Sequence, residues 1–122
     1  MIISHVNTGD KAPYAVNGKE ITVGDVTVNA ANRQDDTEKV IDICLDNQLE
    51  TMREGLGAWY VATIIIPPTQ RELIVGEEKD EEGNDVMIEV VRPLDMKDVE
   101  LRLWRLPEEN NQNIETEEGV IE

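Results

Sequence analysis

Few residues in this sequence have the types and spacing that nucleophilic or acid–base catalysis requires. His5 is the only histidine and Cys44 the only cysteine among 122 residues. His5 falls in an expected strand, where a single histidine is more often structural than catalytic. Cys44 lies in an apolar stretch without a basic cluster, as a small buried hydrophobe does. Because a catalytic site needs a nucleophile, a base and an orienting group, we predict that the protein is not an enzyme.

Two further patterns contain residue types that could bind a cofactor or a metal. Gly55-Leu56-Gly57 precedes an apolar strand instead of opening a helix, which is the wrong order for a nucleotide-binding loop. The acidic run from Glu77 to Asp85 offers hard oxygen ligands, but it lacks the spacing of a calcium loop and its closing bidentate glutamate. We therefore expect a solvated hairpin tip whose charges oppose edge-to-edge pairing, with neither metal nor cofactor.

Residues suited to protein contacts are found near the end of the last expected strand. Glu100, Arg102 and Trp104 alternate with Val99, Leu101 and Leu103, so they share one face of the strand. A tryptophan beside an arginine on a polar face is typical of an interface anchor. The alternative is a sheet covered on both faces, with Trp104 in the core.

The last residues form a second candidate region for contacts. The segment 107–122 is acidic, contains no lysine or arginine, and is interrupted by three apolar residues, Ile114, Val120 and Ile121. Alone, such a composition predicts disorder. We expect it to be an extended tail whose apolar residues contact a partner.

Composition limits the class of partner. The chain has 27 acidic and 11 basic residues and a formal net charge of −16. Direct binding to nucleic acid or to an anionic membrane is therefore not expected, because both need lysine and arginine. One cysteine excludes an intrachain disulfide, the first residues do not resemble a secretory signal, and the longest apolar run, 58–66, is about half a membrane span. These features predict a protein of the host-cell cytoplasm or of a virus particle (virion) assembled there.

The elements that must position these residues are mostly short strands. Asn17-Gly18 joins Tyr14–Val16 to Lys19–Val23 as a type I′ hairpin turn would, and Gly24-Asp25 leads on to Val26–Val28, which completes a three-stranded meander. Further strands are expected at 2–6, 58–66, 72–75, 86–91 and 99–106, where 72–75 and 86–91 form a long hairpin. The segment 58–66 is apolar on both of its alternating faces, as a central strand covered on both sides would be.

Two segments are harder to assign. Residues 37–46 alternate as a strand but could begin as a helix, and we favour the strand. Asn47 followed by Glu50 resembles a capping box, and Leu49, Met52 and Leu56 fall on one helical face, so a helix of about two turns is expected before Gly55 and Gly57.

The sequence thus predicts a mainly β protein with seven to nine strands and one short helix. An antiparallel β-sandwich or a partly open barrel over residues 1–106 would be followed by an extended acidic C-terminal tail, 107–122. The favoured function is a structural, assembly or protein-interaction subunit, for example of a phage or virus particle, which associates with itself or with other subunits. The alternative is an acidic inhibitor or nucleic-acid mimic that occupies a basic site on a nucleic-acid-binding protein.

Overall fold

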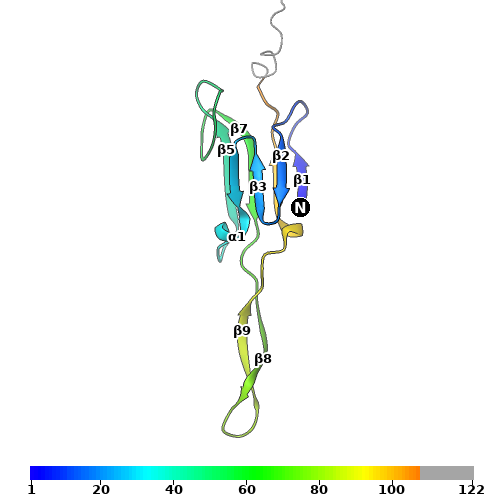
Figure 1. Cartoon of the computed structure of the whole chain (residues 1–122), viewed down its shortest axis with the longest axis vertical. Helices are drawn as coiled ribbons and strands as arrows, with labels where there is room; N and C mark the ends of the chain where they lie inside the picture. The colour runs from blue at the N-terminus through cyan, green and yellow to red at the C-terminus, as the bar shows by residue number, and fades with distance from the viewer. Residues whose placement is uncertain (108–122) are drawn as a thin grey trace, which may run out of the picture.

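The computed structural model describes residues 1–107 and shows a mainly β protein (Figure 1). Strands far outnumber helical segments, as the period-two pattern of the sequence predicts. Residues 1–107 form ten strands, which are β1 (Ile2–His5), β2 (Tyr14–Asn17), β3 (Glu20–Val23), β4 (Val26–Asn29), β5 (Lys39–Leu45), β6 (Met52–Glu54), β7 (Trp59–Ile66), β8 (Arg71–Lys79), β9 (Asp85–Val91) and β10 (Glu100–Leu103). The same part of the chain contains two helical segments, α1 (Ala30–Arg33) and a short 3₁₀ helix, η1 (Met96–Asp98).

Two sheets form the body of the molecule. One has five strands in the order β1-β10-β7-β5-β6, and the other is the meander β2-β3-β4. All strand pairs are antiparallel except β1 with β10, where Ile2 pairs with Glu100 and His5 with Leu103 in parallel. A parallel pair needs a long crossover, and here nearly the whole chain serves as that connection.

The core lies between these two sheets. Ile21, Val23 and Val28 of the meander cluster with buried residues of the larger sheet, among them Ile43, Ile64, Leu101 and Leu103. The two sheets remain separate instead of joining at their edges. The predicted β-sandwich is therefore confirmed, and the barrel is not closed.

The turn signals near the N-terminus predicted the meander correctly. Asn17-Gly18 forms the β2–β3 turn, with Gly18 at φ +63°, and Gly24 at φ +56° forms the next turn. A Cβ on Gly24 would lie 2.4 Å from the sulfur of Met52, so this turn also packs closely on the other sheet. The ambiguous segment 37–46 is a strand, β5, as favoured.

The predicted helix over residues 47–56 is wrong. Asp46 Oδ1 instead accepts the backbone N–H groups of Gln48, Glu50 and Thr51, at 3.1, 3.0 and 3.4 Å, and Leu49 takes a positive φ of 61°. This side chain satisfies the backbone in a turn, and β6 then pairs with β5. The short helix lies elsewhere: α1 is in the polar segment 29–36, and the Asn29 side chain caps it by accepting from Asn32 N at 3.0 Å.

The strand at 58–66 occupies the centre of the five-stranded sheet, but it is not covered equally on both sides. Ala62, Ile64 and Ile66 face the meander and are fully buried. On the opposite face Tyr60 is exposed and Ile65 is half-buried. The strand is therefore covered fully on the side of the meander and only in part on the other side, where Thr63 is nearly buried.

The long hairpin of β8 and β9 projects from the body as an arm (Figure 1). It forms a separate two-stranded sheet, and no residue of either strand belongs to the core cluster. At its base the arm is fixed by ion pairs from Arg71 to Asp36 (2.9 Å) and from Arg92 to Glu72 (2.7 Å). We refer to residues 71–91 as the arm from here on. No helix in residues 1–107 is long and apolar enough to cross a membrane.

Candidate protein-interaction site

The first candidate surface is the face of the five-stranded sheet that turns away from the meander, which we call the outer sheet face. On β10, Leu101 and Leu103 are fully buried in the core, whereas Arg102 is exposed and Glu100 is half-buried. The predicted alternation of this strand is thus confirmed. Because neighbouring strands share the pleat, Glu100 and Arg102 lie on the same face as Ser4 and Thr63.

Trp104 is half-buried on this face and belongs to a small polar network. Its ring stacks on Tyr60 with centroids 5.2 Å apart, and its indole Nε1 donates to Thr63 Oγ1 at 3.3 Å. Thr63 in turn donates to Asp42 Oδ1 at 2.9 Å and is nearly buried. The tryptophan therefore satisfies a buried hydroxyl while part of its ring stays accessible, together with the more exposed Tyr60.

The charged neighbours of Trp104 are already engaged within the chain. Glu100 Oε2 accepts from Arg102 Nε at 3.0 Å and from the Ser4 hydroxyl at 2.8 Å. The hydrogen bond from Arg102, followed by that from Ser4, lowers the pKa of Glu100. The Arg102 side chain is exposed and that of Glu100 is partly buried, so solvent screens the pair and its contribution to stability is small. Glu100 and Arg102 thus present a nearly neutral rim beside the aromatic pair, and their predicted role in binding stays a prediction.

The remaining predicted contact residues, Ile114, Val120 and Ile121, lie outside the described residues. The proposed disorder and partner contacts of the segment 107–122 therefore stay predictions.

The second candidate surface is the arm, whose exposed apolar residues were not predicted to make contacts. In the register of the arm, Ile74 pairs with Ile88 and Val75 with Met87. Both faces of the ribbon therefore carry aliphatic side chains. Of these, Leu73, Val75, Met87 and Val91 are each at least 50% exposed. A signal was present in the sequence: apolar residues at consecutive positions on both strands of a hairpin have nothing within a two-stranded ribbon to bury them.

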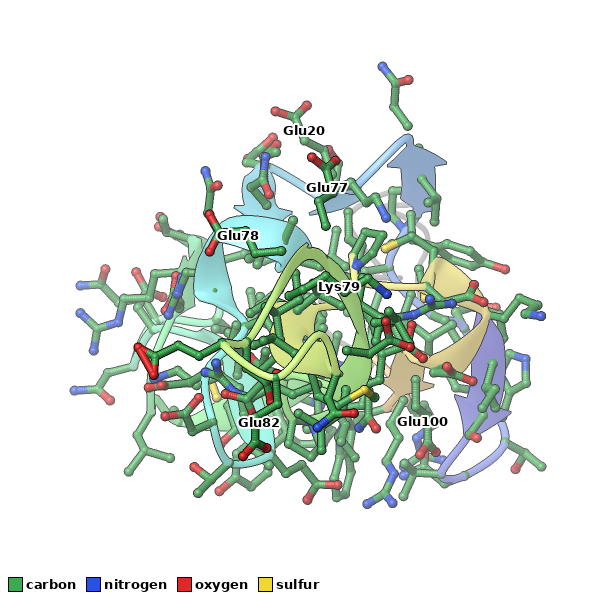
Figure 2. All side chains as sticks on the ribbon, turned by 90° about the horizontal axis from the view of Figure 1, so that it is seen from below. Glu20, Glu77, Glu78, Lys79, Glu82 and Glu100 are labelled. Carbon is green, nitrogen blue, oxygen red and sulfur yellow. The ribbon has the colours of Figure 1, made fainter. Side chains whose placement is uncertain are left out.

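The acidic tip of the arm joins β8 to β9 and holds its own backbone in a turn. Asp80 Oδ1 accepts the N–H groups of Glu82 (2.9 Å) and Asn84 (2.8 Å), and Gly83 has φ +84°. Lys79 pairs with Asp85 across the strands. Viewed from the end of the arm, the labelled side chains of Glu77, Glu78 and Glu82 point to different sides (Figure 2). In residues 1–107, no group of three or more histidine, cysteine, aspartate or glutamate side chains is arranged to hold a metal ion.

A cleft of about 900 Å³ lies where the arm joins the body. Its charged lining residues are three cations and three anions, namely Lys19, Arg71, Arg92, Glu72, Asp95 and Asp98. The three cations already have partners: Lys19 Nζ donates to the Leu94 carbonyl, and the two arginines form the ion pairs of the arm base. The cleft therefore has no excess charge that would select an ionic ligand.

The two residues considered for nucleophilic chemistry are far apart. His5 is exposed at the end of β1, and Cys44 is buried on β5. Two strands, β10 and β7, lie between them in the sheet, which separates their backbones by about 14 Å at the usual strand spacing. Burial raises the pKa of the Cys44 thiol, which favours the unreactive thiol over the thiolate.

Comparison of the chain with protein-family models, with curated proteins and with solved structures found no match.

Proposed function

We propose that this protein is a non-enzymatic interaction or assembly subunit that binds another protein chain through its arm. One observation carries the proposal: the arm exposes aliphatic side chains on both faces, and none of them contributes to the core. Isolated two-stranded hairpins are only marginally stable, and contiguous exposed apolar surface usually marks a contact site. A strand pair that leaves so much apolar surface uncovered within residues 1–107 would gain further burial from a partner.

The position of the arm supports an assembly role. It extends along the long axis of the molecule, away from the sandwich, so it can enter a neighbouring subunit without contact between the two bodies (Figure 1). Such a reach suits a subunit of a larger particle, for example a phage or virus particle. The aromatic pair Tyr60–Trp104 on the outer sheet face offers a second, smaller contact surface.

The alternative function, a nucleic-acid mimic, receives less support. A mimic needs free carboxylates spread over one face at phosphate-like spacing. On the body and at the arm base, the carboxylates of Asp36, Glu54, Glu72 and Glu100 are each paired with an arginine. At the tip, Glu77, Glu78 and Glu82 point to different sides of the arm instead of forming one face (Figure 2).

The test compares the full-length chain with two variants of matched chemistry. Leu73→Thr/Met87→Thr removes apolar surface from one face of the arm, while threonine preserves strand propensity. Val16→Thr/Leu56→Thr removes exposed apolar surface elsewhere on the body. The first measurement is the mass of the purified protein in solution, by light scattering. The second is a pull-down from the native cells with the tagged protein, which shows whether a partner is retained in stoichiometric amount.

We expect the association, with a second copy or with another protein, to be lost in the arm variant and kept in the control variant. Association that is unchanged by the arm substitutions would overturn the proposal. So would a wild-type chain that is monomeric and retains no stoichiometric partner.

A further inference from the structure

The two faces of the arm differ in how much of their apolar surface is accessible. One face, which we call the Leu73 face, carries Leu73, Val75, Met87 and Val91, with exposed fractions from 50 to 65%. The other, the Ile74 face, carries Ile74, Val86 and Ile88, with exposed fractions from 37 to 44%. Gly76 explains part of the difference, because a Cβ there would lie 3.0 Å from the Val86 carbonyl oxygen and 3.1 Å from Ile88 Cγ2. Ile88 therefore folds over the glycine, and both faces remain partly open.

A flat partner surface can cover only one of these faces. The Leu73 face consists of four apolar side chains with Arg71 and Glu89 beside them, a small surface compared with the about 800 Å² that each partner in a specific complex buries. Enclosing the Ile74 face and the tip as well brings the buried area much closer to that value. The partner surface that matches the arm is therefore a groove whose two walls contact the two faces of the hairpin.

Charge complementarity defines the end of that groove. Residues 77–85 contain six acidic residues and one lysine, a formal charge of −5, and Lys79 is already paired with Asp85. Placing this tip against neutral or acidic walls would leave its carboxylates without counter-charges as water is removed. The end of the groove must supply lysine or arginine side chains.

A second copy of this chain has few lysine and arginine side chains to form such an end. All eleven lysine and arginine residues lie within residues 1–107, and six of them form ion pairs within the chain. Each copy also carries a net charge of −16, so bringing a tip to another copy adds like-charge repulsion. The charge balance therefore favours a different protein.

We infer that the arm inserts into an apolar groove of a different protein, and that lysine and arginine side chains line the groove where the tip ends. The inference rests on the proposed function and specifies its partner. The Leu73 face contacts one wall of the groove, the Ile74 face contacts the other, and the tip carboxylates pair with the basic end.

The first experiment identifies what touches each part of the arm. A photo-crosslinking amino acid replaces Val75, Ile74 or Glu81, one site at a time, in the full-length chain expressed in its native cells. Mass spectrometry then identifies the crosslinked peptides. We expect the same partner protein from all three sites, with apolar peptides from the two face positions and a peptide rich in lysine and arginine from the tip. Crosslinks to a second copy of this chain, or no crosslinked product, would overturn the inference.

The second experiment measures affinity for the purified partner at low and physiological salt. Leu73→Thr/Met87→Thr and Ile74→Thr/Ile88→Thr should each weaken binding by about tenfold or more, because each removes contacts with one wall. Glu77→Gln/Glu78→Gln/Glu82→Gln should slow association several-fold and flatten its salt dependence. The matched control Asp25→Asn/Glu38→Gln/Glu50→Gln makes the same change in charge at exposed sites away from the arm and should have less effect.

The outcomes separate this inference from the proposed function. Binding that depends on the Leu73 face alone would overturn the groove, and a tip variant equal to its control would overturn the basic end. Arm-dependent association with a second copy would overturn the inference while leaving an interaction role for the arm. Association independent of the arm would overturn both.

Discussion

At the scale of single residues, Asp46 determines the path of the chain between β5 and β6. Its carboxylate accepts three backbone N–H groups in a turn where the sequence favoured a helix. The hydrogen bond from the backbone of Glu50 is the largest cause that lowers the pKa of Asp46 below its ordinary value of 3.8. The charged form is thus favoured by the folded state, and the turn should depend on pH.

The substitution Asp46→Asn tests this dependence, because asparagine retains the acceptor oxygen but loses the charge. A carboxyl group whose pKa is lowered on folding stabilises the fold above its unfolded pKa, and that stabilisation is lost as pH falls through the folded pKa. The wild-type protein should therefore have the higher urea midpoint at neutral pH. The difference should shrink as the pH falls below about 4. If the difference in urea midpoint between the two proteins stayed constant from pH 7 to pH 3, the effect of the asparagine would come from its amide geometry and not from the lost charge.

At the scale of secondary-structure elements, similar aliphatic residues have different roles in the sandwich and in the arm. Leu101 on β10 is fully buried, whereas Leu73 on β8 is 65% exposed. Leu101→Ala should lower the free energy of unfolding by about 2–5 kcal/mol, because it leaves a cavity between the sheets. Leu73→Ala should change it by no more than about 0.5 kcal/mol. Urea unfolding of both variants measures the difference.

The comparison of these two variants also tests whether the arm contributes to the stability of the folded protein. If Leu73→Ala destabilised the protein as much as Leu101→Ala, the arm would pack on the body. Its apolar residues would then no longer indicate a partner. A small effect together with loss of partner binding would place the role of Leu73 in association.

At the scale of the whole molecule, the net charge of −16 should oppose folding through mutual repulsion. The ion pairs Arg33–Glu54, Arg71–Asp36 and Arg92–Glu72 are partly or largely exposed, so each contributes little. Screening should therefore weaken repulsion more than it weakens attraction. The urea midpoint at pH 7 should rise as NaCl increases from about 20 to 300 mM, where the Debye length falls below about 10 Å. A falling midpoint would show that the ion pairs dominate.

Much of the fold could be predicted from local signals. Asn17-Gly18 and Gly24 specify tight turns between short alternating runs, so the meander followed directly from them. The alternation of residues 99–104 likewise gave the buried face of β10. The helix at 47–56 was wrong because Asp46, one residue before the expected cap, bonds the backbone N–H groups in a different turn.

The candidate site was predicted less well. Trp104 was identified, but its stacking on Tyr60 and its bond to Thr63 depend on the pairing of β10 with β7, which joins residues about forty positions apart. The apolar residues of the arm were assigned to a hairpin without any role in contacts. Their run of Leu73, Ile74 and Val75 resembles that of a core strand, and only the tertiary structure shows that nothing in residues 1–107 covers it.

The sequence by itself determined that the protein is acidic and mainly β, and that its charge gathers at the hairpin tip and in residues 107–122. Composition, period-two alternation and turn residues are local properties, so they can be read along the chain. The tertiary structure decided which apolar residues are buried, because burial depends on the strand order β1-β10-β7-β5-β6 and on the meander that covers one face. The arm lies outside that order, so the structure distinguishes apolar residues that form the core from apolar residues that stay exposed within residues 1–107.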